Sequence, residues 1–590
     1  MGARRSNCSG RLEVEVMSDK ARSVKTFDGL VARHNLTLRA AITAVEDRIS
    51  WSPFKDSPST KIHGTEKPAL GKAAFEARLG KSFQLEQPGI VDWVGDEVSP
   101  FTAQPLGITY PRSTPQALID AASAAMQSWR KVAPTARIAL CLEIAERLYA
   151  RNFEMAHAVM HVAGQSYVQA FSGSGPNALD RGIEALAYAA KAMAEVRPTA
   201  TWQRTFGRDD VVLDKHYKLM PRGIGLVVCC ASFPTWNAYP AIFANLATGN
   251  PAIVKPHPIA ILPMAIVVEV CRETLAEYGC DPNVVMLAVD TIAAPIAQTF
   301  VDHPAVQIID FTGSPRYGVH LERTVTGKLL FTETAGVNSV VIESVDDVAE
   351  TARAIGRSAS LFSGQMCTSP QTIFIPRRGI RTETGHVSFD EVALALVRAV
   401  DEVAADPATA AGVMGAIQGQ LSIDVINRLT EALATRPSVK IVRPAKPYIH
   451  PNFPKARTLT PLIATVDGSC VDLYGEEQFG PVLFLVACSD GDAGVAEAVR
   501  LAAKHGAISC YLYSTDEAFI ARSIEAYEMA GANLSINLHG AMWINFAAAY
   551  SDYHVTGLNP AGNACLTDLA FVTSRFRIVQ RRRPSASISS

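Results

Sequence analysis

Short apolar runs alternate with helical patterns in the middle of this chain, and no other feature restricts its possible folds as strongly. The apolar runs cover residues 225–230, 252–254, 284–287 and 306–309, and an amphipathic segment at 264–278 separates the second from the third. Regular alternation of this kind predicts parallel βαβ units with helices on both faces of a sheet. Ligands of such sheets bind at the carboxyl ends of the strands.

A second alternating region extends from residue 339 to about 537, and apolar residues recur at helical spacing between 115 and 196. A basic, strand-like segment covers 575–583. The chain has 590 residues, of which 48% are hydrophobic and 19% charged, so it can bury more than one core. The sequence therefore predicts an α/β protein with at least two domains.

Charge and cysteine usage exclude several classes of function. A formal net charge of -2 provides no basic field for nucleic acid. The N-terminus lacks the apolar stretch of a signal peptide, and no apolar run is long enough to span a membrane. Eleven scattered cysteines without CxxC spacing fit reduced thiols in the cytoplasm. We therefore expect that the protein has no metal site and that it binds neither nucleic acid nor a membrane.

A carboxylate and a thiol mark the candidate chemistry. Glu333 lies in Phe-Thr-Glu-Thr-Ala-Gly at 331–336, and Cys367 lies in Ser-Gly-Gln-Met-Cys-Thr at 363–368. Together they suit a mechanism in which substrate is first bound covalently to sulfur and then released by an activated water. A single cysteine among eleven is more often a small core residue. What singles out Cys367 is its fixed order with Glu333 and with two strand-ending turns, at 255–256 and 311–314.

In this order the motifs resemble those of the aldehyde dehydrogenase superfamily, over about residues 110–580. The matching segments are Pro-Arg-Gly-Ile-Gly at 221–225, Leu-Ala-Thr-Gly-Asn-Pro-Ala-Ile-Val-Lys-Pro at 246–256, Phe-Thr-Gly-Ser at 311–314 with Gly318, Glu333, Cys367, and Glu-Gln-Phe-Gly-Pro-Val at 477–482. The resemblance implies a Rossmann-type cofactor domain, an α/β catalytic domain and a β arm that pairs subunits into a homodimer or homotetramer.

The implied domain boundaries follow from the positions of these motifs. Residues 110–335 would bind NAD(P) and include an arm hairpin at about 203–220, and residues 336–545 would form the catalytic domain. Residues 546–590 would contain the oligomerisation strand and a disordered tail. We assign no role to the N-terminal extension, residues 1–109.

The resemblance also implies individual roles. Cys367 would attack the aldehyde, and Glu333 would accept a proton from the attacking water. The backbone amides of Gly313 and Gly318 would face the cofactor pyrophosphate, with the hydroxyl of Ser314 as a further donor. Lys255 would reach the adenosine ribose or its 2′-phosphate. Glu477, with Phe479 in the same segment, would hold the nicotinamide ribose.

Two positions depart from the family pattern. In the family, an asparagine stabilises the oxyanion. Counted back without gaps from Gly249-Asn250, the position of that asparagine is occupied by Ser232 in this chain, whereas Asn237 matches it only if a five-residue gap is allowed. We favour Ser232 and keep Asn237 as the alternative, with the Cys367 amide as a further donor. Pro258 stands where many NAD-using relatives have a glutamate, which removes repulsion against a 2′-phosphate. We therefore expect NADP as cofactor, with NAD a close alternative.

Segments 331–338, 374–377 and 551–560 look most like the PaaN family of phenylacetic acid degradation proteins. This resemblance implies oxidation of a coenzyme A-linked semialdehyde, with a separate hydratase as the partner that opens the ring. Two alternatives stay open. One is a coenzyme A-acylating dehydrogenase, against which Glu333 argues, and the other is a non-catalytic subunit of the same fold.

Overall fold

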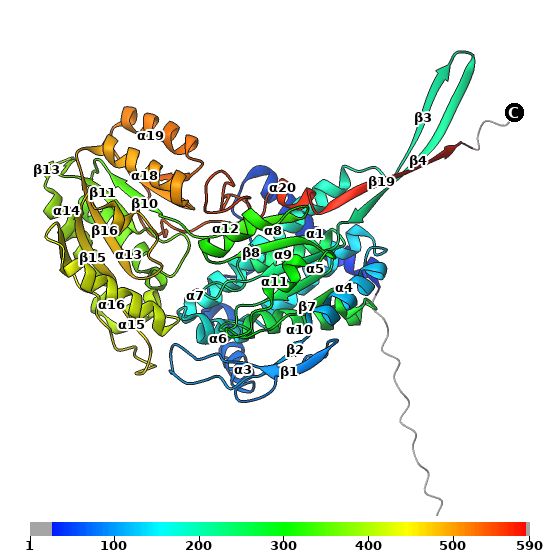
Figure 1. Cartoon of the computed structure of the whole chain (residues 1–590), viewed down its shortest axis with the longest axis horizontal. Coiled ribbons are helices and arrows are strands. Elements are labelled where there is room, and N and C mark those ends of the chain that lie inside the picture. The colour runs from blue at the N-terminus through cyan, green and yellow to red at the C-terminus, as the bar shows by residue number, and fades with distance from the viewer. Residues whose placement is uncertain (1–25, 586–590) are drawn as a thin grey trace, which may run out of the picture.

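Five parallel strands form the first sheet, in the order β7-β6-β5-β8-β9. Two of them, β7 and β8, are labelled in Figure 1. The computed structural model describes residues 26–585. The strands are β5 (Ile224–Val228), β6 (Ala252–Lys255), β7 (Val285–Leu287), β8 (Val306–Thr312) and β9 (Leu329–Glu333). The first four coincide with the predicted apolar runs, which are buried because helices cover both faces of the sheet. The predicted α/β fold is confirmed.

Seven strands form the second sheet, in the order β14-β15-β16-β11-β10-β17-β18. They are β10 (Ser339–Ile342), β11 (Thr372–Pro376), β14 (Val439–Arg443), β15 (Leu462–Asp467), β16 (Val482–Cys488), β17 (Ser509–Tyr513) and β18 (Asn533–Ile536). All neighbours are parallel except β14, which pairs antiparallel with β15. Along β10, Val340 and Ile342 pack in one core and Val341 packs in the other. Alternate side chains thus bury both faces of the sheet.

Each of the two sheets forms the centre of one structural unit with the helices packed on it. We call the unit around the five-stranded sheet the first body and the unit around the seven-stranded sheet the second body. On the second sheet, α13 (Val348–Ser360) and α14 (Phe389–Ala405) cover one face, and α16 (Gln420–Ala434), α18 (Gly491–His505) and α19 (Glu517–Met529) cover the other. Further elements are α2 (Thr60–His63), β1 (Ile90–Val94), β2 (Tyr110–Ser113), α4 (Pro115–Trp129), α7 (Tyr167–Ser172), α9 (Ala238–Ala247), α10 (Leu262–Glu277), α11 (Ala297–Asp302), α12 (Pro315–Thr324), β12 (Ile380–Thr382), β13 (Gly385–Val387), α15 (Pro407–Met414), α17 (Val471–Tyr474) and α20 (Leu569–Thr573). Among residues 26–585, no helix has the length and apolarity needed to cross a membrane.

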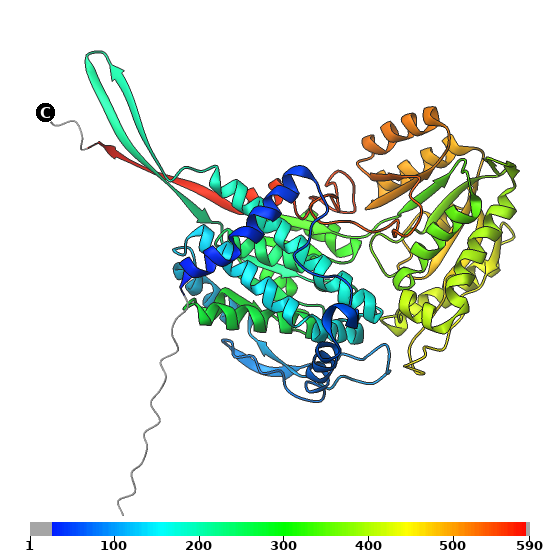
Figure 2. The ribbon, with the colours of Figure 1, turned by 180° about the vertical axis from the view of Figure 1, so that it is seen from behind.

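The N-terminal segment packs on the first body (Figure 2). Helix α1 (Phe27–Asp47) contacts α5 (Pro134–Ala150) and α8 (Ala178–Ala194), and α3 (Glu66–Glu76) contacts α6 (Asn152–Ala163). Apolar residues of this segment share one core with the five-stranded sheet. Residues 27–108 therefore belong structurally to the first body. Residues 1–25 and 586–590, which include most of the predicted disordered tail, lie outside the described residues.

A three-stranded antiparallel arm projects from the first body (Figures 1 and 2). It consists of β3 (Thr199–Phe206), β4 (Asp209–Pro221) and the C-terminal strand β19 (Phe576–Pro584). The hairpin starts four residues before the predicted position 203, because β3 pairs with β4 from Thr199 onward. Exposed Phe206, Ile578 and Val579 give the arm apolar surface.

A buried ion pair anchors the base of this arm. Arg575, fully buried, donates to Asp310 on β8 through Nη2 at 2.5 Å and Nη1 at 2.9 Å. Its guanidinium lies over the rings of Phe571 and Phe331, at 4.0 and 4.7 Å from their centroids. The side chain of Asn250 also donates to the Arg575 carbonyl at 3.0 Å. The C-terminal strand is thereby joined to the five-stranded sheet.

Replacing Arg575 by leucine should destabilise the protein strongly. The change leaves the Asp310 carboxylate buried without its cation, which costs about 3–5 kcal/mol. Thermal unfolding monitored by circular dichroism measures the effect, and Arg581→Leu, at an exposed position of the same strand, serves as control. Equal melting temperatures for the two variants would contradict the anchoring role.

Candidate active site

A cavity of about 690 Å³ is lined by loops of both bodies. The first body contributes residues that follow β5 and β8 and the end of β9, and the second contributes the loop around Cys367 and the segment before β16. The C-terminal loop, residues 546–568, adds a third wall through Phe546, Ala547 and His554. The cavity lies at the carboxyl ends of the strands of the first sheet, where parallel sheets bind ligands.

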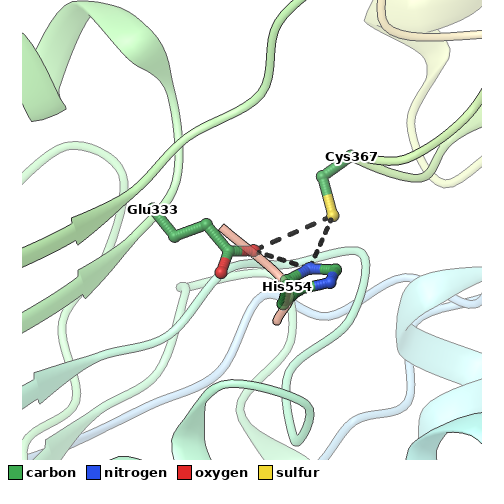
Figure 3. Close-up of side chains that lie close together, drawn as sticks. All are labelled: Glu333, Cys367 and His554. Carbon is green, nitrogen blue, oxygen red and sulfur yellow. Dashed lines mark hydrogen bonds and ion pairs between the residues drawn. The ribbon is translucent and has the colours of Figure 1, made fainter. Parts of the chain in front are cut away.

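Glu333 and Cys367 meet in this cavity (Figure 3). Glu333 is the last residue of β9 and is fully buried, and Cys367 lies in the loop between α13 and β11. The Cys367 thiol points to Glu333 Oε1, with 3.9 Å between Sγ and oxygen. The two residues come from different bodies, so the fold itself creates this pair.

Strained backbone and one asparagine shape the cysteine loop. Phe362, Ser363 and Gly364 have successive positive φ angles of 50°, 49° and 65°. A Cβ at Gly364 would lie 2.4 Å from the Gly480 carbonyl oxygen, so only glycine fits. Asn338 Nδ2 then donates to the Cys367 carbonyl at 2.7 Å. Its Oδ1 accepts amides at the start of β17, which fixes the loop against the sheet.

His554 is a third member of the site that sequence reasoning did not single out. Its Nε2 lies 3.2 Å from Glu333 Oε1 and 3.8 Å from Cys367 Sγ (Figure 3). The side chain is buried, with its ring 5.8 Å from that of Trp236. The one available signal was its place in segment 551–560, which entered the sequence analysis only as part of a family resemblance.

Backbone pairing carries the C-terminal loop to Glu333. The Thr334 amide donates to the Ala561 carbonyl at 2.7 Å, and the Thr332 amide donates to Asn563 Oδ1 at 2.9 Å. Glu333 itself forms a β-bridge with Gly562, where a Cβ would lie 2.6 Å from the Thr332 carbonyl oxygen. The C-terminal loop is thus paired with the end of β9 at Glu333 and Thr334.

The surroundings of Cys367 favour the neutral thiol. Burial raises the pKa of Cys367 well above its usual value, and the negative charge of Glu333, the thiol of Cys230 and Glu477 raise it further. The pKa of Cys230 is raised to about 11, mainly by burial. Cys367 therefore favours the protonated thiol and must lose that proton to act as a nucleophile.

The same three side chains also form a possible metal-ligand set. The donor atoms of Glu333, Cys367 and His554 lie within 4.8 Å of one another. Thiolate, imidazole and carboxylate are the ligands that zinc accepts. Our expectation of no metal site stays a prediction.

Both candidate oxyanion residues line the cavity. The Ser232 carbonyl accepts a hydrogen bond from Gln165 Nε2 at 2.8 Å, which fixes the backbone at this position. Asn237 immediately precedes α9, and its Nδ2 donates to Thr312 Oγ1 at 3.1 Å. Part of the donor capacity of Asn237 is thus used within the protein, and the two alternatives stay open.

Substitution by alanine distinguishes the two donors. We expect Ser232→Ala to slow hydride transfer by about 10²-fold, as loss of one oxyanion donor does in other enzymes, and Asn237→Ala to have a smaller effect. Stopped-flow measurement of cofactor reduction reports this step. A loss confined to Asn237→Ala would mean that Asn237 is the donor and that the ungapped register is wrong.

The predicted phosphate-binding amides are engaged elsewhere. The Gly313 amide donates to the Glu333 carbonyl at 3.1 Å, and the Gly318 amide donates within α12 to the Ser314 carbonyl, also at 3.1 Å. Gly318 is buried, and a Cβ there would lie 2.6 Å from Thr334 Cγ2. This glycine therefore permits close packing of the helix, and the expectation that its amide faces a pyrophosphate is corrected. Ser314, at the N-cap of α12, does line the cavity.

Lys255 is buried and ion-paired, with its Nζ 2.6 Å from Asp290 Oδ1. Glu477 and Phe479 line the cavity from the second body, and burial raises the pKa of Glu477 to about 8. The same cavity is thus lined by residues at strand ends, by Ser314 at the start of α12 and by Glu477. The carboxyl group of Glu477 is able to bind sugar hydroxyls. These residues fit a nicotinamide dinucleotide.

A Rossmann-type sheet joined to a second α/β body that supplies a cysteine next to a glutamate defines a thiol-dependent, nicotinamide-linked dehydrogenase. Comparisons with known proteins give the same class. The sequence profile of the aldehyde dehydrogenase family matches residues 95–546. The chain therefore belongs to the aldehyde dehydrogenase family, whose members oxidise aldehydes with NAD or NADP.

Individual relatives show how far the similarity extends. The crystal structure of an NAD-dependent aldehyde dehydrogenase from Burkholderia multivorans is 45% identical, with a TM-score of 0.91, and the match covers 94% of this chain and 99% of that chain. A 1-pyrroline-5-carboxylate dehydrogenase from Thermus with bound NAD shares the fold at 19% identity, with a TM-score of 0.67 and coverage of 91% and 100%. The 1-pyrroline-5-carboxylate dehydrogenase 2 of Bacillus subtilis (strain 168) is 27% identical over 399 residues, which span 63% of this chain and 68% of the relative.

Proposed function

We propose that this enzyme oxidises a coenzyme A-linked semialdehyde of phenylacetate breakdown to its carboxylate, through a thioester on Cys367. The observation that carries the chemistry is the 3.9 Å contact between Cys367 Sγ and Glu333 Oε1 inside a cavity lined by both bodies. A thiol beside a carboxylate can form a covalent adduct and then hydrolyse it.

In the first half of the reaction the Cys367 sulfur adds to the aldehyde carbon. The resulting oxyanion is stabilised by preorganised donors, for which the Cys367 amide and either Ser232 or Asn237 are the candidates. Glu477 and Phe479 on one wall and Ser314 on the other would hold the dinucleotide. When bound, the nicotinamide supplies the acceptor for hydride leaving the substrate carbon.

In the second half Glu333 activates water. Its carboxylate accepts a proton while the water oxygen attacks the thioester carbon, and the carboxylate product leaves as the Cys367 thiol is restored. Glu333 is fully buried, and its Oε2 has no hydrogen-bond partner among the described residues. This unpaired oxygen is available to an incoming water.

Support for the substrate class comes from two sides. Segment 551–560, which resembles the PaaN family, carries His554 into the site. Asn545 and Gln169 line the cavity with buried amide atoms that lack partners among the described residues, so a substrate with polar groups would satisfy them. Lys255 is the one lysine or arginine among the described cavity residues, and it is paired with Asp290. We therefore place the phosphates of a coenzyme A-linked substrate outside this cavity.

Single-turnover kinetics test the proposed reaction. With excess cofactor and aldehyde, Glu333→Gln should still release one equivalent of reduced cofactor per site, with the Cys367 thiol losing its proton to solvent in place of Glu333. Turnover should then be about 10²- to 10⁴-fold slower, because the thioester accumulates without the base that activates water. Cys367→Ala should show no burst. A burst that persists in Cys367→Ala would contradict covalent catalysis by this sulfur.

The same assay compares substrates. It uses a coenzyme A-linked semialdehyde, the matching free semialdehyde and 1-pyrroline-5-carboxylate, the compound named for the Bacillus and Thermus relatives. Product analysis with and without free coenzyme A separates hydrolysis from acylation. Turnover of 1-pyrroline-5-carboxylate alone would refute the proposed substrate class.

For the cofactor we propose NAD in preference to NADP. The sequence argument for NADP relied on the loss of a carboxylate at Pro258. Asp290, whose side chain is fully buried, pairs with Lys255 at 2.6 Å and neutralises the cation that a 2′-phosphate would need. The 45% identical relative is described as NAD-dependent. The charge balance at Lys255 therefore offsets the argument from Pro258.

Asp290→Asn should shift this preference. Releasing Lys255 from its partner should narrow the ratio of NAD to NADP affinity about tenfold, while the wild type should bind NAD at least tenfold more tightly. Fluorescence titration with each dinucleotide measures both values, and Asp302→Asn, an exposed change on α11, is the control. Equal binding of both dinucleotides by the wild type would contradict the proposal.

We also propose a homodimer or homotetramer paired through the arm, whose exposed Phe206, Ile578 and Val579 offer apolar surface. A separate hydratase would open the ring before this enzyme acts. The ten cysteines of the described residues are all free thiols, which supports a reducing compartment such as the cytoplasm.

A further inference from the structure

We infer that His554 is a catalytic residue of the proposed reaction: its Nε2–H donates to Glu333 in the resting enzyme and to the Cys367 sulfur once the thiol has lost its proton. The inference rests on the proposed function, because it assigns a task within thiol-mediated aldehyde oxidation. It adds a third side chain to the pair of Glu333 and Cys367.

Three atoms form a closed triangle. His554 Nε2 lies 3.2 Å from Glu333 Oε1 and 3.8 Å from Cys367 Sγ, and the third side, Sγ to Oε1, measures 3.9 Å. All three contacts involve the same carboxylate oxygen or the same ring nitrogen (Figure 3). A single imidazole N–H therefore faces both the general base and the nucleophile.

The environment of the ring selects which nitrogen carries the hydrogen. Nδ1 is buried and has no hydrogen-bond partner among the described residues. A buried N–H without an acceptor is rarer and costlier than an unused lone pair, so the hydrogen belongs on Nε2. In this tautomer Nε2–H donates to the ionised Glu333 carboxylate.

The proton balance follows from this arrangement. The Cys367 S–H bond breaks, its electron pair stays on sulfur, and the proton forms an O–H bond at Glu333 Oε1, the nearest carboxylate oxygen. Neutralised Glu333 no longer attracts the Nε2–H strongly. The hydrogen then turns to the thiolate, which is the stronger acceptor, and stabilises it until it attacks the aldehyde. Glu333 releases the proton taken from Cys367 to solvent once the thioester has formed, so its carboxylate is ionised again before water attacks.

The charges around Cys367 explain why such a donor is needed. Glu333 on β9, Cys230 after β5 and Glu477 before β16 all disfavour a thiolate. Among the described cavity residues, the other groups able to carry positive charge are Lys255, which is paired with Asp290, and His257, whose pKa is lowered to about 4 mainly by burial. Within residues 26–585, His554 is the one basic side chain that contacts the sulfur, at 3.8 Å.

Contacts of the protein itself position the loop that carries His554 and the imidazole ring. The side chain of Asn533 donates to the His554 carbonyl at 3.3 Å and to the preceding carbonyl, of Tyr553, at 2.9 Å. Trp236 lies beside the imidazole, and the bridge between Glu333 and Gly562 fixes the same loop eight residues on. A preorganised donor loses little entropy when the thiolate forms.

Thiol alkylation tests the inference without any substrate. The full-length enzyme is treated with iodoacetamide from pH 6 to 10, and modification of Cys367 is followed by peptide mass spectrometry. His554→Leu should slow alkylation at neutral pH about tenfold and raise the apparent pKa of Cys367 by about one unit, because the thiolate loses its donor. His554→Gln, which keeps an N–H donor, should recover part of the rate.

Tyr553→Phe is the matched control on the same loop. Its side chain is half exposed and faces Arg48, so alkylation of Cys367 should match the wild type. Unchanged alkylation profiles in folded His554→Leu, or equal profiles for the leucine and glutamine variants, would overturn the inference. Failure of the proposed function is a separate result, because it would appear as absent aldehyde turnover in the wild type while the alkylation profiles still differ.

Discussion

Pairing between the end of β9 and the C-terminal loop is the contact on which the active site depends. Glu333 belongs to one sheet, Cys367 follows the other sheet's first crossover helix, and His554 comes from a segment more than 180 residues further along the chain. The amide of Thr334 and the bridge at Gly562 bring that segment onto β9. Without this pairing the Glu333 carboxylate and the His554 imidazole would not lie together beside the Cys367 sulfur.

The site balances two electrostatic demands. A thiol that stays protonated until substrate arrives resists oxidation and unproductive reactions, and burial next to Glu333 provides this protection. Attack on an aldehyde nevertheless requires the thiolate. A proton acceptor 3.9 Å away and an N–H donor 3.8 Å away satisfy that demand without a permanent positive charge. The pairing of Lys255 with Asp290 likewise leaves that part of the cavity without an unpaired positive charge.

Sequence patterns predicted the elements well and the long-range contacts poorly. Buried parallel strands can be predicted from the sequence because each apolar run is a local pattern. Glu333 and Cys367 can be predicted because each lies in a distinctive short motif. His554 and Asp290 are single residues whose significance arises only when distant loops meet. Gly318 shows the opposite error, since a glycine at a helix start resembles a phosphate-binding turn while its amide is bonded within the helix and its missing side chain makes room for Thr334.

The most direct measurement of the central claim is the mass of the enzyme caught between the two half-reactions. Glu333→Gln incubated with NAD and an oxidisable aldehyde, then quenched in acid and digested, should yield the peptide containing Cys367 with the added mass of the acyl group. The same treatment of Cys367→Ala should yield no acylated peptide. An acyl group on another residue, or cofactor reduction without any acylated peptide in Glu333→Gln, would contradict a mechanism in which Cys367 carries the substrate and Glu333 releases it.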